Sequence, residues 1–312
     1  MTCRIGNELN TATHGALSFN LPVPRILAVL DLCLAPGGFT TATLTHNPRV
    51  SVHGITLPLA LGGYEVRIPR WQTDTRIAAI RFLDITMLAG EMGVTVDGDG
   101  DGDGVALVPA THPDAGRFLF ERPFAGEQFD LVFCGGTVVR NHARAAYRCR
   151  AGCESVRLLT SQLVLGLGRL RPGGTLVLVM HRADAWDSVG LLRLFAGFAD
   201  VVLFKPARAH ARKSSFYMVA RNVQSGGPEA VEAVEGLKRR WREATFGDGG
   251  VEGEGVDEGS EEVLVADGSG SVAESLLAEF GEQLVRMARP VFEIQAKALR
   301  TAPWAQTGSG AM

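Results

Sequence analysis

The sequence predicts an α/β fold: a doubly wound, mainly parallel sheet over residues 1–222, followed by a helical, acidic C-terminal extension over 223–312. Strand-like and helix-like segments alternate along the first part, which is typical of parallel strands joined by helices. One apolar run ends at Asp31 and leads through the turn 35–38 into a helix-compatible segment. A strand, a glycine turn and a helix in that order form a ligand crevice at the carboxyl end of a parallel strand.

The first four predicted strands are short apolar runs bounded by turn-forming residues. They cover residues 25–31, 50–55, 76–82 and 129–134. The helix after the first strand is expected over 39–45, ending near Asn47 and Pro48 because proline cannot continue a helix. The third strand leaves Asp84 just beyond its end.

The second half of the predicted sheet begins with a long amphipathic helix over 144–170, which Pro172, Gly173 and Gly174 end. A strand, a helix and two further strands follow over residues 175–180, 189–198, 201–205 and 215–221. We expect the last two strands to form an antiparallel pair that closes the sheet.

The extension differs from the first part in its charge. Residues 1–222 carry a net charge of +5 and residues 223–312 one of −8, which together give −3 for the chain. Helices are predicted over 228–244 and 272–300, joined by an acidic linker over 246–271 that we expect to be disordered. The last helix has an apolar stripe, so we expect it to dock on the body, with a binding partner as the alternative. The stripe consists of Leu276, Leu277, Phe280, Leu284 and Met287.

Two patterns that could suggest a metal site do not support one. The Asp-Gly alternation over 97–104 resembles the start of a calcium loop, but Val108 or Ala110 stands where the loop needs a bidentate glutamate. We expect this segment to be a flexible insertion. Cys149 and Cys153 are four residues apart without a second pair of ligands, so zinc is not expected either.

The composition indicates an intracellular protein with a well-filled core. Hydrophobic residues make up 46% of the 312 residues, and the mean hydropathy is +0.11. No apolar run approaches the length of a membrane helix, and the first 20 residues lack the pattern of a secretory signal. Five cysteines without framework spacing indicate reduced thiols. We therefore expect a cytoplasmic or nuclear protein that does not bind membranes.

The turn after the first strand carries the most specific motif of the chain. Residues 31–39 have the pattern Asp-x-Cys-x-Ala-Pro-Gly-Gly-Phe. The turn lacks the lysine of a phosphate-binding loop and the Gly-x-Gly-x-x-Gly spacing of a dinucleotide site. It resembles motif I of S-adenosylmethionine (SAM)-dependent methyltransferases, in particular the FtsJ-like ribose methyltransferases. The alternative is an ordinary turn between a strand and a helix, whose glycines serve packing only.

Three later stretches extend this resemblance over residues 25–222 and occur in the order that the family requires. The stretch 129–136 is similar to the family's fourth-strand motif, and 170–177 is similar to its proline-glycine-glycine turn and following strand. The stretch from Lys205-Pro206 to Ala220 is similar to its last motif, "lysine-proline … serine-serine-glutamate-x-tyrosine". With Trp186 and the stretch 140–147, the chain most resembles a fungal group of FtsJ-like domain proteins.

The resemblance implies a Rossmann-like SAM-methyltransferase sheet and a set of cofactor-binding residues. The turn residues would surround the methionine and the sulfonium, Thr56 would approach the ribose, and Asp84 would accept a hydrogen bond from the adenine amino group. A carboxylate in the place of Asp84 could equally cap a helix. The implied cofactor set is Asp31, Ala35, Pro36, Gly37, Gly38, Phe39, Thr56 and Asp84.

The residues that FtsJ-like enzymes use for catalysis are absent from this chain. A ribose hydroxyl is a weak nucleophile, so a base must take its proton as the methyl group leaves the sulfur. The family uses a lysine–aspartate–lysine–glutamate tetrad. Gly135 stands at the aspartate position, Val179 at the central lysine position and Ser215 at the glutamate position. Before motif I the chain has no lysine, only Arg4 and Arg25.

Three interpretations follow from the missing tetrad. The chain methylates RNA ribose hydroxyls with another base, for which His181 is the candidate because histidine titrates near neutral pH. Alternatively, it is a catalytically inactive protein that binds SAM or RNA, or its catalytic residues have drifted. His181 could also be purely structural. Candidate contacts to RNA phosphates are Arg140, Arg144, Arg212 and Lys213, although a basic helix face can also be merely solvated.

Overall fold

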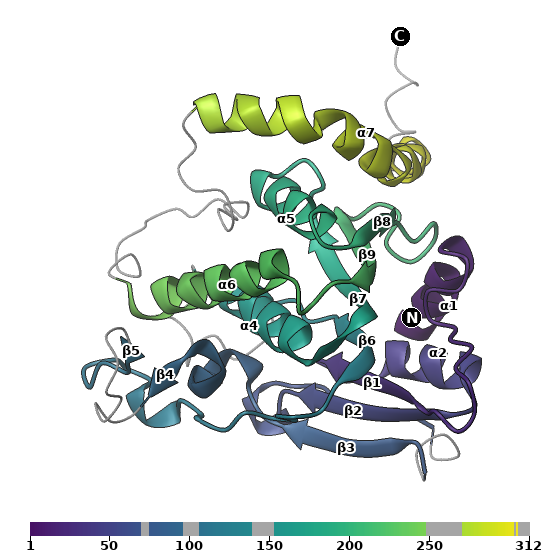
Figure 1. Cartoon of the computed structure of the whole chain (residues 1–312). Coiled ribbons are helices and arrows are strands. Elements are labelled where there is room, and N and C mark those ends of the chain that lie inside the picture. The colour runs from purple at the N-terminus through teal and green to yellow at the C-terminus, as the bar shows by residue number, and fades with distance from the viewer. Residues whose placement is uncertain (70–74, 96–105, 139–152, 248–269, 303, 305–312) are drawn as a thin grey trace.

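A seven-stranded sheet with helices on both faces forms the body of the molecule in the computed structural model (Figure 1). The structure describes residues 1–69, 75–95, 106–138, 153–247, 270–302 and 304. Several predictions therefore lie outside the described residues: the Asp-Gly segment, most of the acidic linker, the start of the long helix, and Arg140 and Arg144.

The sheet has the strand order β3-β2-β1-β6-β7-β9-β8. Neighbouring strands are parallel from β3 to β7, whereas β9 runs antiparallel to both β7 and β8. The strands are β1 (Leu27–Leu32), β2 (Val50–Thr56), β3 (Ile77–Phe82), β6 (Phe129–Cys134), β7 (Leu170–His181), β8 (Asp200–Phe204) and β9 (Ser215–Val223). The predicted α/β class and the antiparallel final pair are confirmed, and the pair has β9 inside the sheet and β8 at its edge.

The helices also match the predicted ones, with one addition. They are α1 (Thr2–Ala12), α2 (Gly38–His46), α4 (Glu154–Arg169), α5 (Trp186–Ala196), α6 (Pro228–Phe246) and α7 (Gly270–Arg300). Short 3₁₀ turns lie at η1 (Leu59–Leu61), η2 (Ile85–Met87), η3 (Ala89–Met92) and η4 (Ala115–Arg117). A small second sheet pairs β4 (Val94–Thr95) with β5 (Ala106–Leu107). The prediction missed this small sheet and α1.

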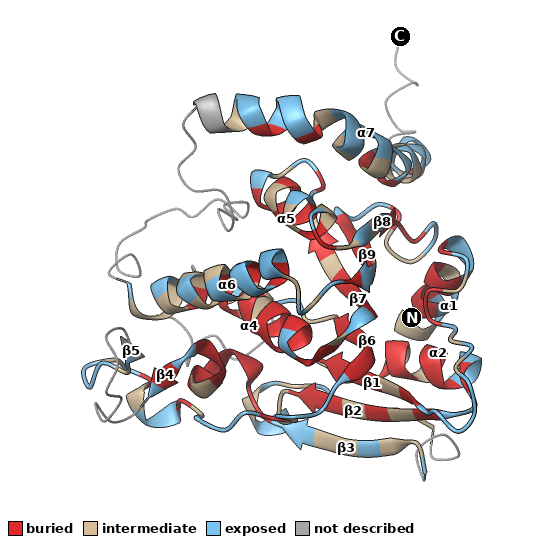
Figure 2. Cartoon of the chain, viewed as in Figure 1, coloured by how far each residue is buried: buried red, intermediate tan, exposed pale blue. Residues whose placement is uncertain are grey.

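The strands of the sheet alternate side chains between two hydrophobic clusters, as the pleat of a strand requires. Leu27 and Val29 of β1 belong to the cluster under α1 and α2, whereas Leu30 and Leu32 belong to the cluster under the helices of the opposite face. In Figure 2, the buried residues follow the strands and the inner sides of the helices, and the outer sides of α6 and α7 are exposed. Helices therefore cover both faces, as in a doubly wound sheet.

β7 begins earlier than predicted, because the proline-glycine-glycine turn is part of the strand. Leu170 already pairs with Phe129 of β6, directly after the last residue of α4. The carboxylate of Asp130 accepts hydrogen bonds from Arg25 and Arg171 and, at 3.0 Å, from the backbone amide of Ala28. The register against β6 shifts between Leu170, which pairs with Phe129, and Thr175, which pairs with Leu131, so residues 171–174 form a bulge beside this partly buried ion cluster. The predicted turn is therefore present inside the strand, and Gly173 has a φ of +80° there.

The helix that sequence analysis missed, α1, packs on α2. Its buried side chains include Ile5 and Leu9, which are four residues apart, so a helical apolar face was present. The helix has no acidic residue in its first turn and no side chain that caps it, so the usual start signals are lacking. Gly6 faces Ala42 of α2, and a Cβ on Gly6 would lie 2.7 Å from the Cβ of Ala42. The glycine allows the two helices to approach closely.

α7 docks on the body, as its apolar stripe predicted, and crosses over α5 and β8 (Figure 1). It buries Leu276, Phe280, Ala288 and Val291. Among the described residues, no helix is both long and apolar enough to cross a membrane.

The close approach of α1 and α2 predicts that Gly6→Ala destabilises the protein. The added methyl group has no room, so we expect a loss of about 1–3 kcal/mol in the free energy of unfolding, the usual range for overpacking. Gly168→Ala is the matched control, because Gly168 is also helical and a Cβ there would meet no atom within 4 Å. Urea unfolding measures both; equal stabilities of the two variants would contradict the packing of α1 on α2.

Candidate functional site

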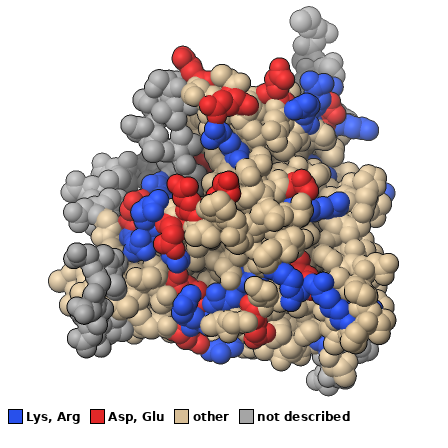
Figure 3. Space-filling model, viewed as in Figure 1, with Lys and Arg blue, Asp and Glu red and all other residues tan. Residues whose placement is uncertain are grey.

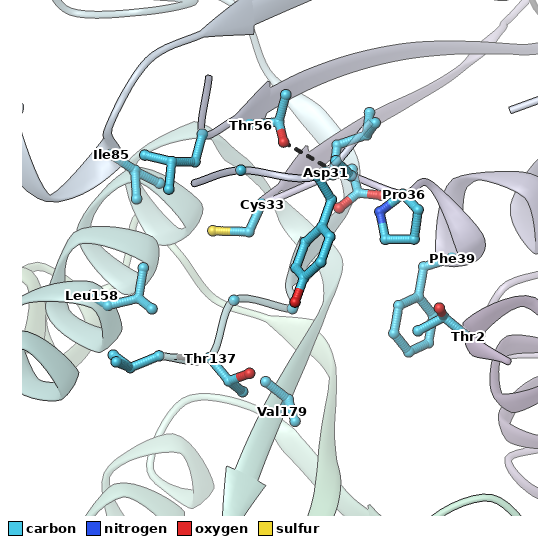
Figure 4. Close-up of a pocket in the computed structure, with 18 of the residues that line it drawn as sticks. Thr2, Asp31, Cys33, Pro36, Phe39, Thr56, Ile85, Thr137, Leu158 and Val179 are labelled. Carbon is cyan, nitrogen blue, oxygen red and sulfur yellow. Dashed lines mark hydrogen bonds between the residues drawn. The ribbon is translucent and has the colours of Figure 1, made fainter. Parts of the chain in front are cut away.

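A pocket of about 850 Å³ opens at the carboxyl ends of the parallel strands. It lies at the point where the strand order reverses, because β1 and β6 are neighbours in the sheet although the chain runs through β2 and β3 between them. Ligands of doubly wound sheets bind at this kind of switch point. In Figure 4, Asp31 and Cys33 from the end of β1 lie on the same side of the pocket as Thr56, while Thr137 and Val179 lie opposite.

The pocket gathers nearly all of the predicted cofactor residues. Gly37 is the exception, since it does not line the pocket. Those that line it are Asp31, Ala35, Pro36, Gly38, Phe39, Thr56 and Asp84. The motif therefore identified the pocket correctly, whereas which of these residues contact a cofactor stays a prediction.

The two turn glycines make room for protein atoms. Gly37 has φ of +96°, and a Cβ there would lie 2.4 Å from Cγ1 of Ile68. A Cβ on Gly38 would lie 2.5 Å from the Cβ of Thr2 and 2.7 Å from the backbone nitrogen of Cys3, both in α1. Packing therefore requires glycine at both positions, as the alternative of an ordinary turn predicted, and contact of the turn with a cofactor stays a prediction. The turn nevertheless lines the pocket, and so do Met1 and Thr2.

Asp31 is the buried acid of the pocket. Its Oδ2 accepts a hydrogen bond of 2.5 Å from the hydroxyl of Thr40 in α2. Burial raises the pKa of Asp31 to about 7, although the hydrogen bonds from Thr40 act in the opposite direction. Burial also raises the pKa of Cys33 to about 12, and the carboxylates of Asp31 and Asp84 add to that effect. Burial thus disfavours negative charge at this end of the pocket. A cationic group of a ligand would compensate for that and favour the ionised form of Asp31.

Thr56 and Phe39 are fixed by the elements around them. The hydroxyl of Thr56 accepts a hydrogen bond of 3.3 Å from the backbone amide of Ala35, drawn as the dashed line in Figure 4. The ring of Phe39 stacks on Phe133 at 5.2 Å and meets the edge of Tyr217 at 5.5 Å. These contacts tie the turn to β2, β6 and β9, so the pocket wall is preformed.

Asp84 caps a helical turn, one of the two roles that the sequence left open, and also lines the pocket, as the other role requires. As the residue that caps η2, it accepts hydrogen bonds at Oδ1 from the amide of Thr86, at 3.0 Å, and from the Thr86 hydroxyl, at 2.7 Å. Within the described part of the chain, Oδ2 of Asp84 has no hydrogen bond, and Asp84 lines the pocket. The cap therefore orients one oxygen and leaves the other to a ligand.

The three positions that the resemblance assigns to the family's catalytic side chains also line the pocket. They are Gly135 just after β6, Val179 in β7 and Ser215 at the start of β9. The buried hydroxyl of Ser215 has no hydrogen-bond partner among the described residues. The wall opposite the motif I turn therefore carries neither a carboxylate nor a lysine at these positions.

Two histidines lie at this wall. His181, the last residue of β7, pairs with Ser215 across the sheet, and both line the pocket. Burial lowers the pKa of His181, and the charges of Lys205 and Lys213 lower it further. Burial likewise lowers the pKa of His210, with further contributions from Lys213, Lys205 and His181. Both imidazoles are therefore unprotonated at neutral pH and can accept a proton. Sequence analysis selected Arg212 and Lys213 from this region but not His210.

The basic side chains of the last motif lie in three different environments. Of the two predicted phosphate contacts, Lys213 lines the pocket, whereas Arg212 does not and its guanidinium lies 5.5 Å from the ring centre of Trp304. Lys205 is buried and outside the pocket wall, where its Nζ donates hydrogen bonds to the carbonyls of Lys213 and, at 2.8 Å, Ser215. Burial lowers the pKa of Lys205 to about 8. Lys205 thus fixes the loop that carries His210 and Lys213.

Other lining residues carried no signal in the sequence. They come from α1, from the segment after β2 and from the region after β6, where nothing marked a functional position. Examples are Thr2, Tyr64, Thr137 and Leu158. As to metals, the part of the chain that the structure describes has no group of three or more His, Cys, Asp or Glu side chains that could hold an ion.

Comparison with known families gives a match over most of the chain. The model of the family described as FtsJ-like methyltransferase matches residues 16–223, which include every strand of the large sheet. α1 precedes the matched range, and α6 and α7 follow it. No curated protein matches the chain.

Solved structures similar to the chain are distant. An O-methyltransferase family protein from Burkholderia thailandensis has 12% identity and a TM-score of 0.37. The match covers 71% of this chain and 57% of that protein. N-methyltransferase NodS from Bradyrhizobium japonicum, in complex with S-adenosyl-l-homocysteine, has 16% identity and a TM-score of 0.38. The match covers 69% of this chain and 86% of NodS. Human methyltransferase-like protein 13, in complex with SAH, has 15% identity and a TM-score of 0.39. The match covers 79% of this chain and 93% of the chain in that structure. These likenesses are too slight to bear on activity.

The raised pKa of Asp31 predicts a pH-dependent difference between the wild type and Asp31→Asn. The native state holds a proton on Asp31 that the unfolded chain, with its ordinary pKa of 3.8, releases between pH 4 and 7. Asp31 therefore stabilises the fold at low pH and loses this contribution as the pH rises through 7. In urea unfolding, we expect the wild type to lose stability relative to Asp31→Asn between pH 5 and pH 8.

The control for this prediction is Asp200→Asn, which removes an exposed carboxylate from β8. Parallel stability curves of the wild type and Asp31→Asn over this pH range would show that Asp31 is ionised in the native state, contrary to the prediction.

Proposed function

The chain belongs to the FtsJ-like methyltransferase family, and from that premise we propose that it transfers the methyl group of SAM to a ribose hydroxyl of RNA. SAM is the cofactor of the family. One observation carries the proposal: a single pocket connects the motif I turn and Asp84 with the wall that holds His181 and Lys213. A cofactor and a substrate group can therefore meet inside it.

The pocket suggests an orientation for SAM. The adenine amino group would donate a hydrogen bond to Oδ2 of Asp84, and the ribose would lie near Thr56. The methionine part would lie near Asp31, where the cationic sulfonium and ammonium groups favour the ionised carboxylate. Its carboxylate would lie at the amino terminus of α2, which favours negative charge. This orientation directs the methyl group toward the wall of Val179 and Ser215.

We assign the role of base to His181. In the proposed step, the ribose oxygen forms a bond to the methyl carbon while the carbon–sulfur bond breaks, and S-adenosylhomocysteine leaves. The proton of the hydroxyl passes to an imidazole nitrogen of His181 and then to water. The lowered pKa keeps this imidazole unprotonated at neutral pH, as a base requires. Lys213 would hold a neighbouring phosphate.

The second candidate is a protein that binds SAM without turnover. The observation in its favour is that Gly135, Val179 and Ser215 give the pocket none of the side chains that the family uses. The two candidates agree on cofactor binding and differ in methyl transfer, so the test must measure binding and transfer separately.

The loop between β8 and β9 supports an RNA substrate. Arg208 and Lys213 are exposed on this loop, and Lys213 also lines the pocket. On the face of the molecule that Figure 3 shows, acidic and basic side chains are interspersed, so that face has no extended basic surface. The support for phosphate contact therefore comes from the rim of the pocket rather than from that face.

The proposal predicts that His181→Ala abolishes methyl transfer and leaves cofactor affinity unchanged. Loss of a general base lowers the rate by about 10² to 10⁴-fold. Transfer of label from tritiated SAM to total RNA measures activity, mass spectrometry of the digested RNA identifies 2′-O-methylated nucleosides, and calorimetry measures SAM affinity. The matched control is His46→Ala, because His46 is an exposed histidine outside the pocket.

Each result of this experiment favours one candidate. If the wild type binds SAM but no label reaches any RNA, the second candidate holds. Full activity of His181→Ala would remove His181 as the base, and an absence of SAM binding by the wild type would contradict the proposed cofactor site.

A further prediction concerns RNA affinity. If Arg208 and Lys213 contact phosphates, replacing either by alanine reduces the slope of log K against log salt by about 0.7–0.9, because one fewer counterion is released. Filter binding at several salt concentrations measures the slope, with Arg289→Ala on α7 as the control. Unchanged slopes for both variants would mean that RNA does not bind along this loop.

A further inference from the structure

α6 of the C-terminal extension contacts the 3₁₀ turn η2, which lines the pocket, although α6 lies outside the range that the family model matches. It packs beside α4 on the face opposite α1 and α2 (Figure 1). Its buried side chains recur every three or four residues and form one face of the helix. They are Ala230, Ala233, Leu237 and Trp241. Trp241 is among the largest fully buried side chains of the described residues.

Trp241 is linked to the 3₁₀ turn that follows Asp84. Its indole Nε1 donates a hydrogen bond of 3.2 Å to the carbonyl oxygen of Thr86. The same oxygen accepts a hydrogen bond of 3.0 Å from Nη2 of Arg157 in α4. One carbonyl of η2 is therefore held by two helices, one of which belongs to the extension.

The position of the Arg157 side chain is fixed by contacts with α6. The Arg157 side chain is fully buried, and its guanidinium carbon lies 5.6 Å from the centre of the Trp241 ring. Its Nε donates a hydrogen bond of 3.0 Å to the hydroxyl of Thr245, one turn after Trp241. Glu154 lies 3.4 Å from its Nη1. A buried cation needs such partners, and the indole face and the Thr245 hydroxyl come from α6.

Thr86 connects Trp241 and Arg157 with Asp84 in the pocket. Its carbonyl faces Trp241 and Arg157, while its amide and hydroxyl donate to Oδ1 of Asp84. Hydrogen bonds on both sides of one residue fix its backbone. Because they also fix Oδ1, the direction of Oδ2 into the pocket is set from α6.

We propose that Trp241 is a positioning residue of the cofactor site, which holds Asp84 in the orientation that recognises the adenine amino group. The C-terminal extension thereby adds a second hydrogen bond to a carbonyl that Arg157 of the family domain already holds. This inference rests on the proposed contact between Asp84 and adenine. It adds that base recognition and the docking of α6 are coupled, so binding at one stabilises the other.

The test compares two ligands that differ at the group that Asp84 would recognise. S-Adenosylhomocysteine carries the adenine amino group, and S-inosylhomocysteine carries a carbonyl oxygen there, which repels the carboxylate. Calorimetry gives the ratio of the two affinities for the full-length wild type and for Trp241→Phe, which keeps an aromatic ring but loses the indole N–H. We expect Trp241→Phe to reduce the preference for the adenine ligand by about threefold to tenfold, the usual effect of one hydrogen bond.

Leu237→Ala is the matched control, since Leu237 is buried on the same face of α6, one turn before Trp241. It weakens packing, and we expect it to leave the ligand preference unchanged. An unchanged preference in Trp241→Phe, or an equal loss in Leu237→Ala, would overturn the role of Trp241. A wild type that binds neither ligand would instead refute the proposed function.

A second measurement applies if Trp241→Phe does not fold. Hydrogen exchange of the wild type, with and without S-adenosylhomocysteine, reports on the coupling directly. We expect the ligand to slow the exchange of amides in residues 237–246 as well as that of Thr86. Protection at Thr86 without any change in α6 would overturn the inference.

Discussion

The parallel pairing of β1 with β6 is the constraint on which the rest of the molecule depends. Val29 to Leu32 pair with Leu131 to Cys134, although almost a hundred residues separate the two strands in the sequence. The chain leaves β1 toward one edge of the sheet and leaves β6 toward the other, so the connections diverge and leave a space between them. The motif I turn, η2 and the end of β7 all border this space.

The sequence predicted the sheet well because local signals and tertiary structure agree there. The fourth predicted strand matches β6 residue for residue, and motif I leads to the pocket. Predictions were wrong where a distant contact decides the structure. β7 starts at Leu170 rather than at Thr175, beside the ion pair of Arg171 with Asp130, and α1, which packs on Gly38, was not predicted. Neither contact has a signature in the local sequence, and the same is true of Trp241.

The pocket combines a family cofactor motif with a different set of side chains at the opposite wall. At the positions that the resemblance assigns to the family's lysine, aspartate and glutamate, the pocket is lined by Val179, Gly135 and Ser215. Basic groups are nevertheless present nearby, since Lys205 anchors the loop that carries His210 and Lys213 beside His181. β7 and the loop before β9 thus place basic groups at this wall, where the proposed reaction needs a base. The extension contributes on the other side, where α6 supports η2.

The most direct measurement is a crystal structure of the protein with S-adenosylhomocysteine. We predict that the adenine amino group lies within hydrogen-bond distance of Oδ2 of Asp84, that the homocysteine part lies beside Asp31, and that the sulfur faces the wall of Val179 and His181. A ligand bound in the reverse orientation, or one outside the space between β1 and β6, would contradict both the assignment of the site and the role of His181.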